Sequence, residues 1–474
     1  MHTLAGLLAG CLLALPVLLV PAGCANIIPP AGGPRDSLPP VLVKASPADS
    51  LKNFKANRIT LSFDEYVDIQ NLQDNLIVSP VPKTQPAVDH KLNTITIRLR
   101  DSLEPNTTYT LNFGQAIKDI NEGNVLKNFT YMFSTGARFD SLQLRGRVIL
   151  AQTGEADSTL LVLLHRRGDD SAIIKEKPRY VARLDNQGNF LFRNLPADTF
   201  YLYALKDESG SYRFSGRDQL FAFADKALKV DGTDTSTHLL YAFADNEGVS
   251  PAGPRAAKPA APPKEKRLVI KTNLDGNRQD LLGNLVLSVE QPLRGLDSSR
   301  IHFSSDSSFQ PVSGYRWIRD STSTQLTLLY PWKENTLYNL VIDKDFAEDT
   351  LGRKLLKADT IRFTTKQRAD YGLVRITFRN LDLASHPVLQ FIQHNNVVDS
   401  FALAGNSFSR ELFPPGDYEL RILFDRNQNG RWDPGHFFGR REQPELARPV
   451  PNGRINIKPN WENEFEREAP PPAP

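Results

Sequence analysis

Residues 57–69 read NRITLSFDEYVDI, and the alternation of apolar and polar side chains in this stretch predicts a half-buried β-strand. Further strand-like segments follow, bounded by Asn, Asp, Gly or Pro: NLIVSPV (75–81), NTITIRLRDSL (93–103), TTYTLNFGQAI (107–117) and NFTYMFSTG (128–136). Short strands separated by turn residues at a spacing of about ten are typical of a β-sandwich. We therefore expect residues 39–136 to form a β-sandwich.

Length and composition extend this interpretation to the whole chain. The 474 residues exceed one compact core and indicate three or four domains, while 34 prolines and many Val, Ile, Thr and Phe runs favour strands over helices. We expect an all-β protein of tandem β-sandwiches. The net charge of +3, from 57 basic and 54 acidic residues, provides no large positive field, which argues against a nucleic-acid partner.

The N-terminal residues predict export. The apolar run LAGLLAGCLLALPVLLV (4–20) contains Cys11 and is followed by small residues and Cys24, as in a secretory leader over residues 1–23. The segment resembles a bacterial lipoprotein signal, although Pro21 and the lack of a preceding Lys or Arg depart from that pattern. The resemblance implies that Cys24 becomes the first mature residue, carries diacylglycerol and N-linked acyl groups, and anchors the chain in a membrane. The alternative is a simple cleaved leader in which Cys24 has no such role.

The next residues form a predicted stalk and a recognisable domain. Residues 24–38 are rich in Pro and Gly and predict an extended stalk. The motifs PPVLVKASPADS, ITLSFDEYVD, LEPNTTYTLNF, IKDINEGN and FTYMFSTG resemble, in order and spacing, the SbsA-type bacterial Ig-like domain of surface-layer proteins. This resemblance covers nearly all of residues 39–136.

The same order of motifs returns about 229 residues later, in LVLSVEQPLRGLDSSRIHF, LTLLYPWKENTLYNLVI, FAEDTLGRKL and DTIRFTTK. We expect a second, divergent Ig-like domain over residues 267–366. The predicted equivalences are Asn106, Thr107 and Tyr109 with Asn335, Thr336 and Tyr338; Asp119 with Asp349; Phe133 with Phe363; and Thr135 with Thr365.

The segments that follow the two Ig-like domains also match each other. GNFLFRNLPADTFYLYAL and NSFSRELFPPGDYELRIL resemble the carboxypeptidase-regulatory, transthyretin-like β-sandwich, which implies such domains over residues 142–245 and 370–460 and a duplicated two-domain unit. That fold is not itself catalytic in the family. Residues 246–266 predict a Pro/Ala/Lys linker that spans roughly 60 Å, and residues 461–474 a Pro-rich disordered tail.

The segment DRNQNGRWD (425–433) has the oxygen-rich spacing of a calcium loop. Its expected ligands are the side chains of Asp425, Asn427, Asn429 and Asp433 and the backbone carbonyl of Arg431. His436 stands where an EF-hand has a bidentate Glu, so we expect a weak site. The alternative is a hairpin turn without an ion, because Asn-Gly favours tight turns and Asp and Asn cap them. The equivalent loop of the first half is shorter and retains only Asp207 and Gly210.

The sequence predicts no enzyme. Its eight histidines are scattered, and it contains no H-E-x-x-H, G-x-S-x-G, P-loop or dinucleotide-binding motif. Asp64 and Glu65 are adjacent in a predicted strand, where neighbouring side chains point to opposite faces. We expect them to have a structural role.

Asp followed by Ser or Thr and then an aliphatic residue or Thr is unusually frequent, and is similar to an O-glycosylation sequon of one Gram-negative envelope lineage. That resemblance implies Ser37, Ser50, Ser102 and Ser141 as acceptors. The alternative is that Asp-Ser and Asp-Thr accumulate because they begin turns. The triplets start at Asp36, Asp49, Asp101, Asp140, Asp157, Asp170, Asp320, Asp349 and Asp359.

Together these patterns predict a lipid-anchored, non-catalytic protein of the cell envelope, most consistent with the outer membrane of a Gram-negative bacterium, that acts as a binding, adhesion or spacing module. The alternative is an accessory subunit that captures polysaccharide for an envelope enzyme or uptake complex. Exposed aromatic side chains would favour sugar capture, although most tryptophans in β-sandwiches are packing residues. The four candidates are Trp317, Trp332, Trp432 and Trp461.

Overall fold

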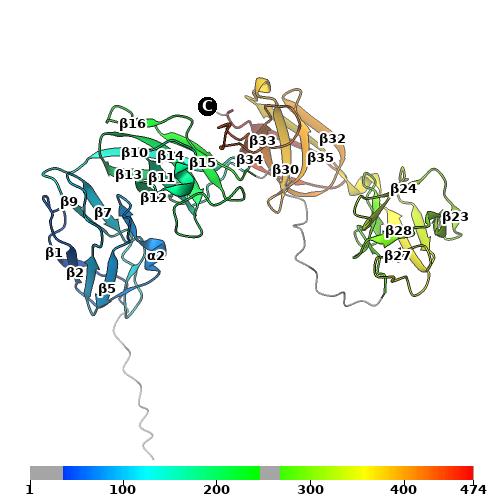
Figure 1. Ribbon diagram of the computed structural model, residues 1–474. Coiled ribbons are helices and arrows are strands. Elements are labelled where there is room, and N and C mark those ends of the chain that lie inside the picture. Colours follow the sequence, from blue (N-terminus) through cyan, green and yellow to red (C-terminus); the bar gives the residue numbers. More distant parts are fainter. Residues whose placement is uncertain (1–35, 246–266, 473–474) are drawn as a thin grey trace, which may run out of the picture. The chain divides into compact units, whose positions relative to one another are not determined.

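The computed structural model describes residues 36–245 and 267–472. The predicted leader, the stalk up to residue 35, the linker and Cys24 lie outside the described residues. The chain divides into two compact units, Met1–Phe139 and Asp140–Pro474. Strands dominate every described region, and four successive sets of sheets follow one another along the chain, coloured from blue to red in Figure 1. The expectation of an all-β, tandem-sandwich protein is confirmed. We name the four sets the first to fourth sandwich.

The first sandwich contains three sheets around one core. The largest has the order β1-β2-β6-β5, with bounds Leu42–Ser46, Arg58–Phe63, Thr94–Arg98 and Ala87–Lys91. The second has the order β4-β7-β9, with bounds Ile77–Ser79, Thr108–Asn112 and Thr130–Ser134, and a short pair joins β3 (Val67–Ile69) to β8 (Ile117–Asp119). Alternate residues of β2 and β6 point inward, so Ile59, Leu61 and Phe63 are buried while the residues between them are more exposed. A short helix, α2, covers Leu72–Asn75.

The third sandwich repeats this topology. Its sheets have the orders β18-β20-β25-β24 (Lys271–Thr272, Leu285–Ser288, Gln325–Leu329, Arg316–Arg319), β19-β28-β26-β22-β23 (Arg278–Gln279, Asp359–Thr365, Leu337–Ile342, Ile301–Ser305, Gln310–Pro311) and β21-β27 (Leu293–Arg294, Glu348–Asp349). The strands β2, β6, β7 and β9 thus correspond to β20, β25, β26 and β28. A short 3-10 helix, η2, covers Ser298–Arg300.

Hydrogen bonds at equivalent positions support the predicted duplication. The hydroxyl of Thr135 accepts the backbone N–H of Thr107 at 3.0 Å, and that of Thr365 accepts the N–H of Thr336 at 2.9 Å. Asn106 and Asn335, one residue earlier, both have positive φ, at 52° and 46°. Asparagine tolerates this backbone region better than most residues. The alignment of these turns by sequence therefore corresponds to shared geometry.

The second sandwich packs a three-stranded sheet against a larger one. The first has the order β13-β10-β17 (Asn189–Leu195, Leu142–Leu150, His238–Ala242), in which β10 and β17 are parallel. The second has the order β12-β11-β14-β15 (Tyr180–Arg183, Leu160–His165, Asp198–Lys206, Phe221–Phe223), and β16 (Leu228–Val230) also pairs with β14. Apolar side chains from both sheets form one core. A short helix, α3, covers Ala172–Lys175.

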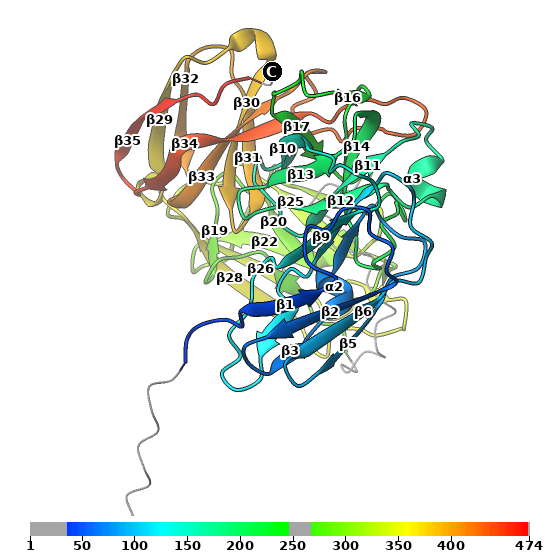
Figure 2. The ribbon, with the colours of Figure 1, turned by 90° about the vertical axis from the view of Figure 1, so that its left-hand side faces the viewer.

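The fourth sandwich repeats the second. Figure 2 shows β32, β29 and β35 side by side, the counterparts of β13, β10 and β17, with bounds Ser407–Phe413, Gly372–Arg379 and Glu462–Glu468. The opposing sheet has the order β31-β30-β33-β34 (Asn396–Ala402, Pro387–Gln393, Gly416–Phe424, Leu446–Ile457). The short 3-10 helices η3 (Arg368–Asp370) and η4 (Leu383–Ser385) lie before β29 and β30.

The strand β35 corrects the prediction of a disordered tail from residue 461. Residues 462–468 pair in parallel with β29, and the adjoining Ala469 is buried. Because the partner strand lies about ninety residues away in the sequence, local composition did not indicate this pairing. The acidic pair also lies elsewhere than expected, since Asp64 and Glu65 fall between β2 and β3 rather than within a strand. Among the described residues, no helix has the length and apolar character needed to cross a membrane.

Candidate functional site

The connection between β33 and β34, residues 425–445, contains the predicted calcium ligands. It begins at Asp425, which is 2% exposed. The carboxylate of Asp425 accepts the backbone N–H of Asn429 at 3.2 Å and of Gly430 at 2.7 Å. Gly430 has a φ of 76°, which glycine adopts without strain. These contacts close a tight turn around the aspartate, as predicted for DRNQNG.

The other predicted ligands lie in the same turn. The side-chain amides of Asn427 and Asn429 both donate to Asp433 Oδ2 at 2.6 Å, and the backbone N–H of Arg431 donates to Asn429 Oδ1 at 2.7 Å. The structure therefore brings all five predicted residues together. In this arrangement the two amides present nitrogen to Asp433, whereas calcium takes only oxygen ligands. Binding of calcium by both side chains requires their amide groups to turn.

Glu445 is a functional candidate that the sequence analysis missed. Its side chain is 2% exposed and accepts the backbone N–H of Arg426 at 2.7 Å and of Asp433 at 3.2 Å. Burial, with a smaller contribution from the charges of Asp425 and Asp433, raises the pKa of Glu445. The two hydrogen bonds act in the opposite direction and only partly offset this rise. Glu445 thus ties the two ends of the turn together. No local pattern links it to the turn, because it stands twelve residues after Asp433.

The arrangement accounts for a turn that is stable without an ion. In the first half, Asp207 accepts the backbone N–H of Ser209, Ser211 and Tyr212 at 3.2, 3.2 and 2.6 Å, so the same aspartate-centred turn forms there without the asparagine pair. Across residues 36–245 and 267–472, no group of three or more His, Cys, Asp or Glu side chains is placed to hold a metal ion. Calcium binding by the second-half loop stays a prediction.

The same connection extends onto the second sandwich. Phe437, which is 2% exposed, lies with its ring centroid 5.8 Å from that of Tyr203 and 5.0 Å from those of Phe221 and Phe223. Phe438 packs beside Phe214 at 5.1 Å. Tyr203 of β14 lies on the sheet face that points away from the second sandwich's own core, because the core residues of β14 include Leu202 and Ala204. Phe221 and Phe223 of β15 lie on the same face. The connection therefore covers a second apolar face of that sheet.

Polar contacts surround Phe437. Arg441 Nη2 lies 2.8 Å from an oxygen of Asp170, Gln443 Nε2 donates to Asp225 at 2.7 Å, and His436 Nδ1 lies 3.0 Å from an oxygen of Asp245. The backbone N–H of Ala447, in β34, donates to the carbonyl of Ala151 at 2.8 Å. A buried aromatic anchor with hydrogen bonds at its rim is the usual anatomy of a specific protein interface.

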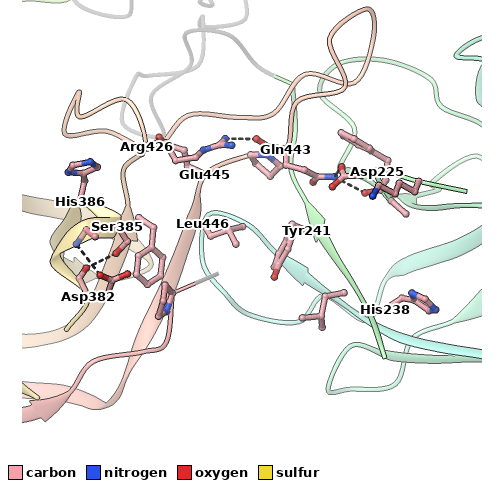
Figure 3. A pocket seen from close by; sticks show the side chains of 18 of the residues that line it. Asp225, His238, Tyr241, Asp382, Ser385, His386, Arg426, Gln443, Glu445 and Leu446 are labelled. Atoms are coloured by element: carbon pink, nitrogen blue, oxygen red, sulfur yellow. Dashed lines mark hydrogen bonds between the residues drawn. The ribbon is translucent and has the colours of Figure 1, made fainter. Parts of the chain in front are cut away.

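A cleft of about 870 Å³ lies beside this connection. Figure 3 shows Tyr241, from β17, and Leu446, from β34, on its two sides. Its polar lining includes Asp225, Asp382 and Arg426. The hydroxyl of Tyr241 is buried and has no hydrogen-bond partner among the described residues. The volume is that of a small-molecule site, but the mixed lining assigns no particular ligand.

The predicted glycosylation acceptors Ser37, Ser50, Ser102 and Ser141 are all exposed. Several aspartates of the same triplets serve turns: Asp157 accepts the N–H of Thr159 at 2.9 Å, and Asp320 accepts the N–H of Gln325 at 2.8 Å. Asp349 is fully buried, and its carboxylate accepts the N–H groups of Leu351 and Arg353. These contacts favour the turn interpretation at those positions, and glycosylation stays a prediction.

Residues 36–135 match the family model of the bacterial Ig-like domain. The first sandwich is therefore similar to bacterial Ig-like domains, and this match covers one of the four sandwiches. The comparison with curated proteins found no match.

Several solved structures match the chain at low similarity. BcpA, the major pilin subunit of Bacillus cereus, is 10% identical over 69% of this chain and 100% of its own, with a TM-score of 0.16. The S-layer protein SbsC is 13% identical over 87% of this chain and 54% of its own, with a TM-score of 0.16. The TIE protein of Bacillus anthracis is 11% identical over 92% and 75%, with a TM-score of 0.17. Scores this low carry no argument about function.

Proposed function

We propose that this chain is a lipid-anchored, non-catalytic protein of the bacterial cell envelope, held in the membrane through Cys24 and acting as a binding, adhesion or spacing module. The observation that carries this proposal is the repeated architecture. A unit of two β-sandwiches occurs twice in tandem, and the first sandwich, which matches a bacterial Ig-like domain, follows closely after the predicted leader and Cys24. Folds of this kind present loops and sheet edges as contact surfaces.

The contacts of Phe437 refine the proposal. A spacer keeps its ends at a fixed separation only if its domains are held together. The buried aromatic contacts of Phe437 with Tyr203, Phe221 and Phe223 connect the second and fourth sandwiches. The loop that makes this connection also carries the predicted calcium turn. We therefore assign the residues 425–445 a structural role in coupling the two copies of the unit. In this proposal, ligands or partners meet the surfaces that remain exposed.

Membrane fractionation tests the anchor. The full chain and the Cys24→Ala variant are expressed in a Gram-negative host, and membrane and soluble fractions are compared. The proposal predicts that the parent chain fractionates with the outer membrane and that Cys24→Ala is released from it. A Cys24→Ala chain that stays in the membrane would contradict lipid anchoring.

Trp461 favours polysaccharide capture as a second candidate function. Its side chain is 64% exposed, and the Lys458 ammonium lies 5.2 Å from the ring centroid, whereas Trp332 is packed against a core. An exposed indole is a surface on which a sugar ring stacks. Affinity electrophoresis through envelope polysaccharide should show retardation of the chain that is lost in Trp461→Ala. Equal mobility of the parent and Trp461→Ala in every polysaccharide would exclude this role for Trp461.

A further inference from the structure

One end of the first sandwich exposes several large apolar side chains. Three connections meet there: the one after β2, the β5–β6 turn and the one after β8. Backbone hydrogen bonds join them, from the N–H of Val67 to the carbonyl of Leu92 at 3.0 Å and from the N–H of Ile120 to the carbonyl of Tyr66 at 3.1 Å. The side chains of Tyr66, Leu92 and Ile120 are 54%, 57% and 54% exposed. More than half of each of these three side chains is therefore exposed to solvent at the same end of the first sandwich.

The described chain begins at the same end, as Figure 1 shows. The carbonyl of Asp36 accepts a hydrogen bond from the Asn124 side chain at 3.2 Å, and the carbonyl of Val41 accepts the N–H of Asp64 at 3.1 Å. Leu38 and Val41 are also exposed, at 68% and 58%. We define the apolar end by these five exposed side chains: Leu38, Val41, Tyr66, Leu92 and Ile120.

A leucine at position 92 is unfavourable for the backbone conformation of the β5–β6 turn. Its φ is 56°, in the left-handed region that glycine and asparagine favour and that leucine rarely adopts. A leucine here gains little burial within the sandwich, since more than half of it is exposed. The residue type is therefore not explained by the stability of this turn. A contact outside the sandwich would explain it.

The third sandwich has the same backbone hydrogen bonds with polar side chains at two of these sites. The N–H of Leu293 donates to the carbonyl of Ser323 at 2.8 Å, and the N–H of Thr350 donates to the carbonyl of Pro292 at 2.9 Å. Ser323 therefore corresponds to Leu92, Thr350 to Ile120, and Pro292 to Tyr66. Ser323 has a φ of 58°, close to that of Leu92. The fold thus accepts serine and threonine at these sites. Exposed apolar side chains at these two sites, Leu92 and Ile120, are a property of the first copy.

We propose that the apolar end rests in the interfacial layer of a lipid bilayer, next to the point where the chain departs toward Cys24. This inference rests on the proposed lipid anchor. Twelve peptide units separate Cys24 from Asp36 and span at most about 43 Å when fully extended. The anchor therefore holds this end within about 43 Å of the membrane surface. Acyl chains bind more stably when a second membrane contact supplements them, and exposed apolar side chains supply such a contact.

The charges at this end specify the lipid. Asp36, Asp64 and Glu122 lie near Glu65, and burial together with the charges of Asp119 and these three carboxylates raises the pKa of Glu65. An acidic surface is repelled by anionic headgroups. We therefore expect zwitterionic lipids to bind the apolar end better than anionic lipids.

A pair of labelled variants tests the proposal on the full chain. A single cysteine is introduced by Leu92→Cys or, at the equivalent position of the third sandwich, by Ser323→Cys, and each is labelled with an environment-sensitive fluorophore. The acylated Cys24 does not react with the label, because its sulfur is blocked. In vesicles of phosphatidylethanolamine and phosphatidylcholine that contain brominated acyl chains, we expect quenching at position 92 to be at least threefold stronger than at position 323. Equal quenching at the two positions would overturn the proposal.

Failure of the anchor is detected separately, by the mass of the N-terminal peptide. If Cys24 carries no acyl group, the proposed function fails, and the apolar end is then tested with the Cys24→Ala chain and added vesicles. The Leu92→Ser/Ile120→Thr variant takes the residues of the third sandwich, so its melting temperature should be unchanged. We expect its vesicle partition coefficient to be at least tenfold below that of the Cys24→Ala parent. For both chains, the partition coefficient should be lower on anionic vesicles than on zwitterionic vesicles.

The matched control removes two exposed leucines elsewhere, in Leu351→Ser/Leu356→Ser, and should leave vesicle binding unchanged. Sedimentation of the unanchored chain distinguishes a lipid from a protein occupant. If Leu92→Ser/Ile120→Thr dissociates an oligomer and leaves vesicle binding unchanged, the apolar end is an interface between copies and the lipid proposal is wrong.

Discussion

The outer faces of two equivalent sheets show how the copies have diverged. With Pro196 and Pro414 aligned, Tyr203 of β14 corresponds to Arg421 of β33. Tyr203 packs against Phe437, whereas Arg421, which is 4% exposed, lies 3.9 Å from Glu155. In both β14 and β33, several consecutive residues are buried because both faces of each strand are covered. The second sandwich supplies an aromatic face and the fourth supplies the loop that covers it.

The first and third sandwiches differ in another way. Their sheets and turn hydrogen bonds are the same, yet Leu92 and Ile120 in the first copy stand where the third has Ser323 and Thr350. The backbone framework has been kept while the side chains at one end have changed. Divergence between the copies therefore shows which surfaces to compare in search of a partner. The predictions below alter one copy and use the other as its control.

Phe437→Ala should have the largest effect. Removing a buried aromatic side chain costs about 3–5 kcal/mol, and here the loss falls on the contact between the second and fourth sandwiches. Chemical denaturation should show this loss in the free energy of unfolding. Phe309→Ala, at a side chain that is 45% exposed, should change it by less than about 0.5 kcal/mol. An effect of Phe437→Ala as small as that of the control would show that the two sandwiches are not coupled through this ring.

His165→Ile should remove an acid sensitivity of the second sandwich. Ile392 occupies the equivalent position of the fourth, since His165 pairs with Tyr201 and Ile392 with Glu419. Burial lowers the pKa of His165 to about 4, so the unfolded chain, with a histidine pKa of about 6.5, takes up a proton first as the pH falls. The histidine therefore lowers the free energy of unfolding by about 3 kcal/mol between pH 6.5 and pH 4.

Denaturation curves at pH 7 and pH 4 measure this difference. The parent should lose about 3 kcal/mol more than His165→Ile between the two pH values. Replacement of the exposed His394, whose φ is 49°, by Asn serves as the control and should lose as much stability between the two pH values as the parent. Parallel losses in the parent and His165→Ile would mean that His165 is protonated in the folded chain.

Calcium should distinguish the two aspartate turns. If the loop binds, calcium at a hundredfold its Kd adds about 2.7 kcal/mol to stability, seen as a rise of several degrees in the melting temperature of the full chain relative to EDTA. The rise should vanish in Asp425→Ala and persist in Asp207→Ala, because only the second-half turn has the Asn427 and Asn429 pair. No rise in the parent would leave residues 425–433 as a hairpin turn.

The buried aspartates of the first and third sandwiches should have the smallest effects. Backbone N–H groups outweigh burial and hold the pKa values of Asp119 and Asp349 below the usual range. Loss of either carboxylate leaves part-buried N–H groups without their acceptor, at about 2 kcal/mol. Asp349→Ala should cost more than Asp119→Ala because Asp349 also pairs with Arg353. Unfolding free energies of the two variants make the comparison, and equal costs would mean that the Arg353 pair contributes nothing measurable.

Local patterns predicted most of the fold. The alternation in RITLSF and the turn residues around it are determined by neighbouring positions, and the duplication preserves them, so Thr135 and Thr365 were aligned correctly by sequence. The outer sheet face covered by Phe437 was missed, although LLVLLH (160–165), a nearly continuous apolar run, was a signal for burial on both sides. The pairing of β35 with β29 and the approach of Glu445 to Asp433 depend on distant segments, which periodicity does not report.

The central claim is that the chain is anchored to a membrane through Cys24. Its most direct test is the intact mass of the chain extracted from membranes of the expressing cells. We predict a mature protein that lacks residues 1–23 and carries a diacylglyceryl and an N-acyl group on Cys24. A mature protein whose Cys24 is an unmodified thiol, or a chain that retains its leader, would contradict it.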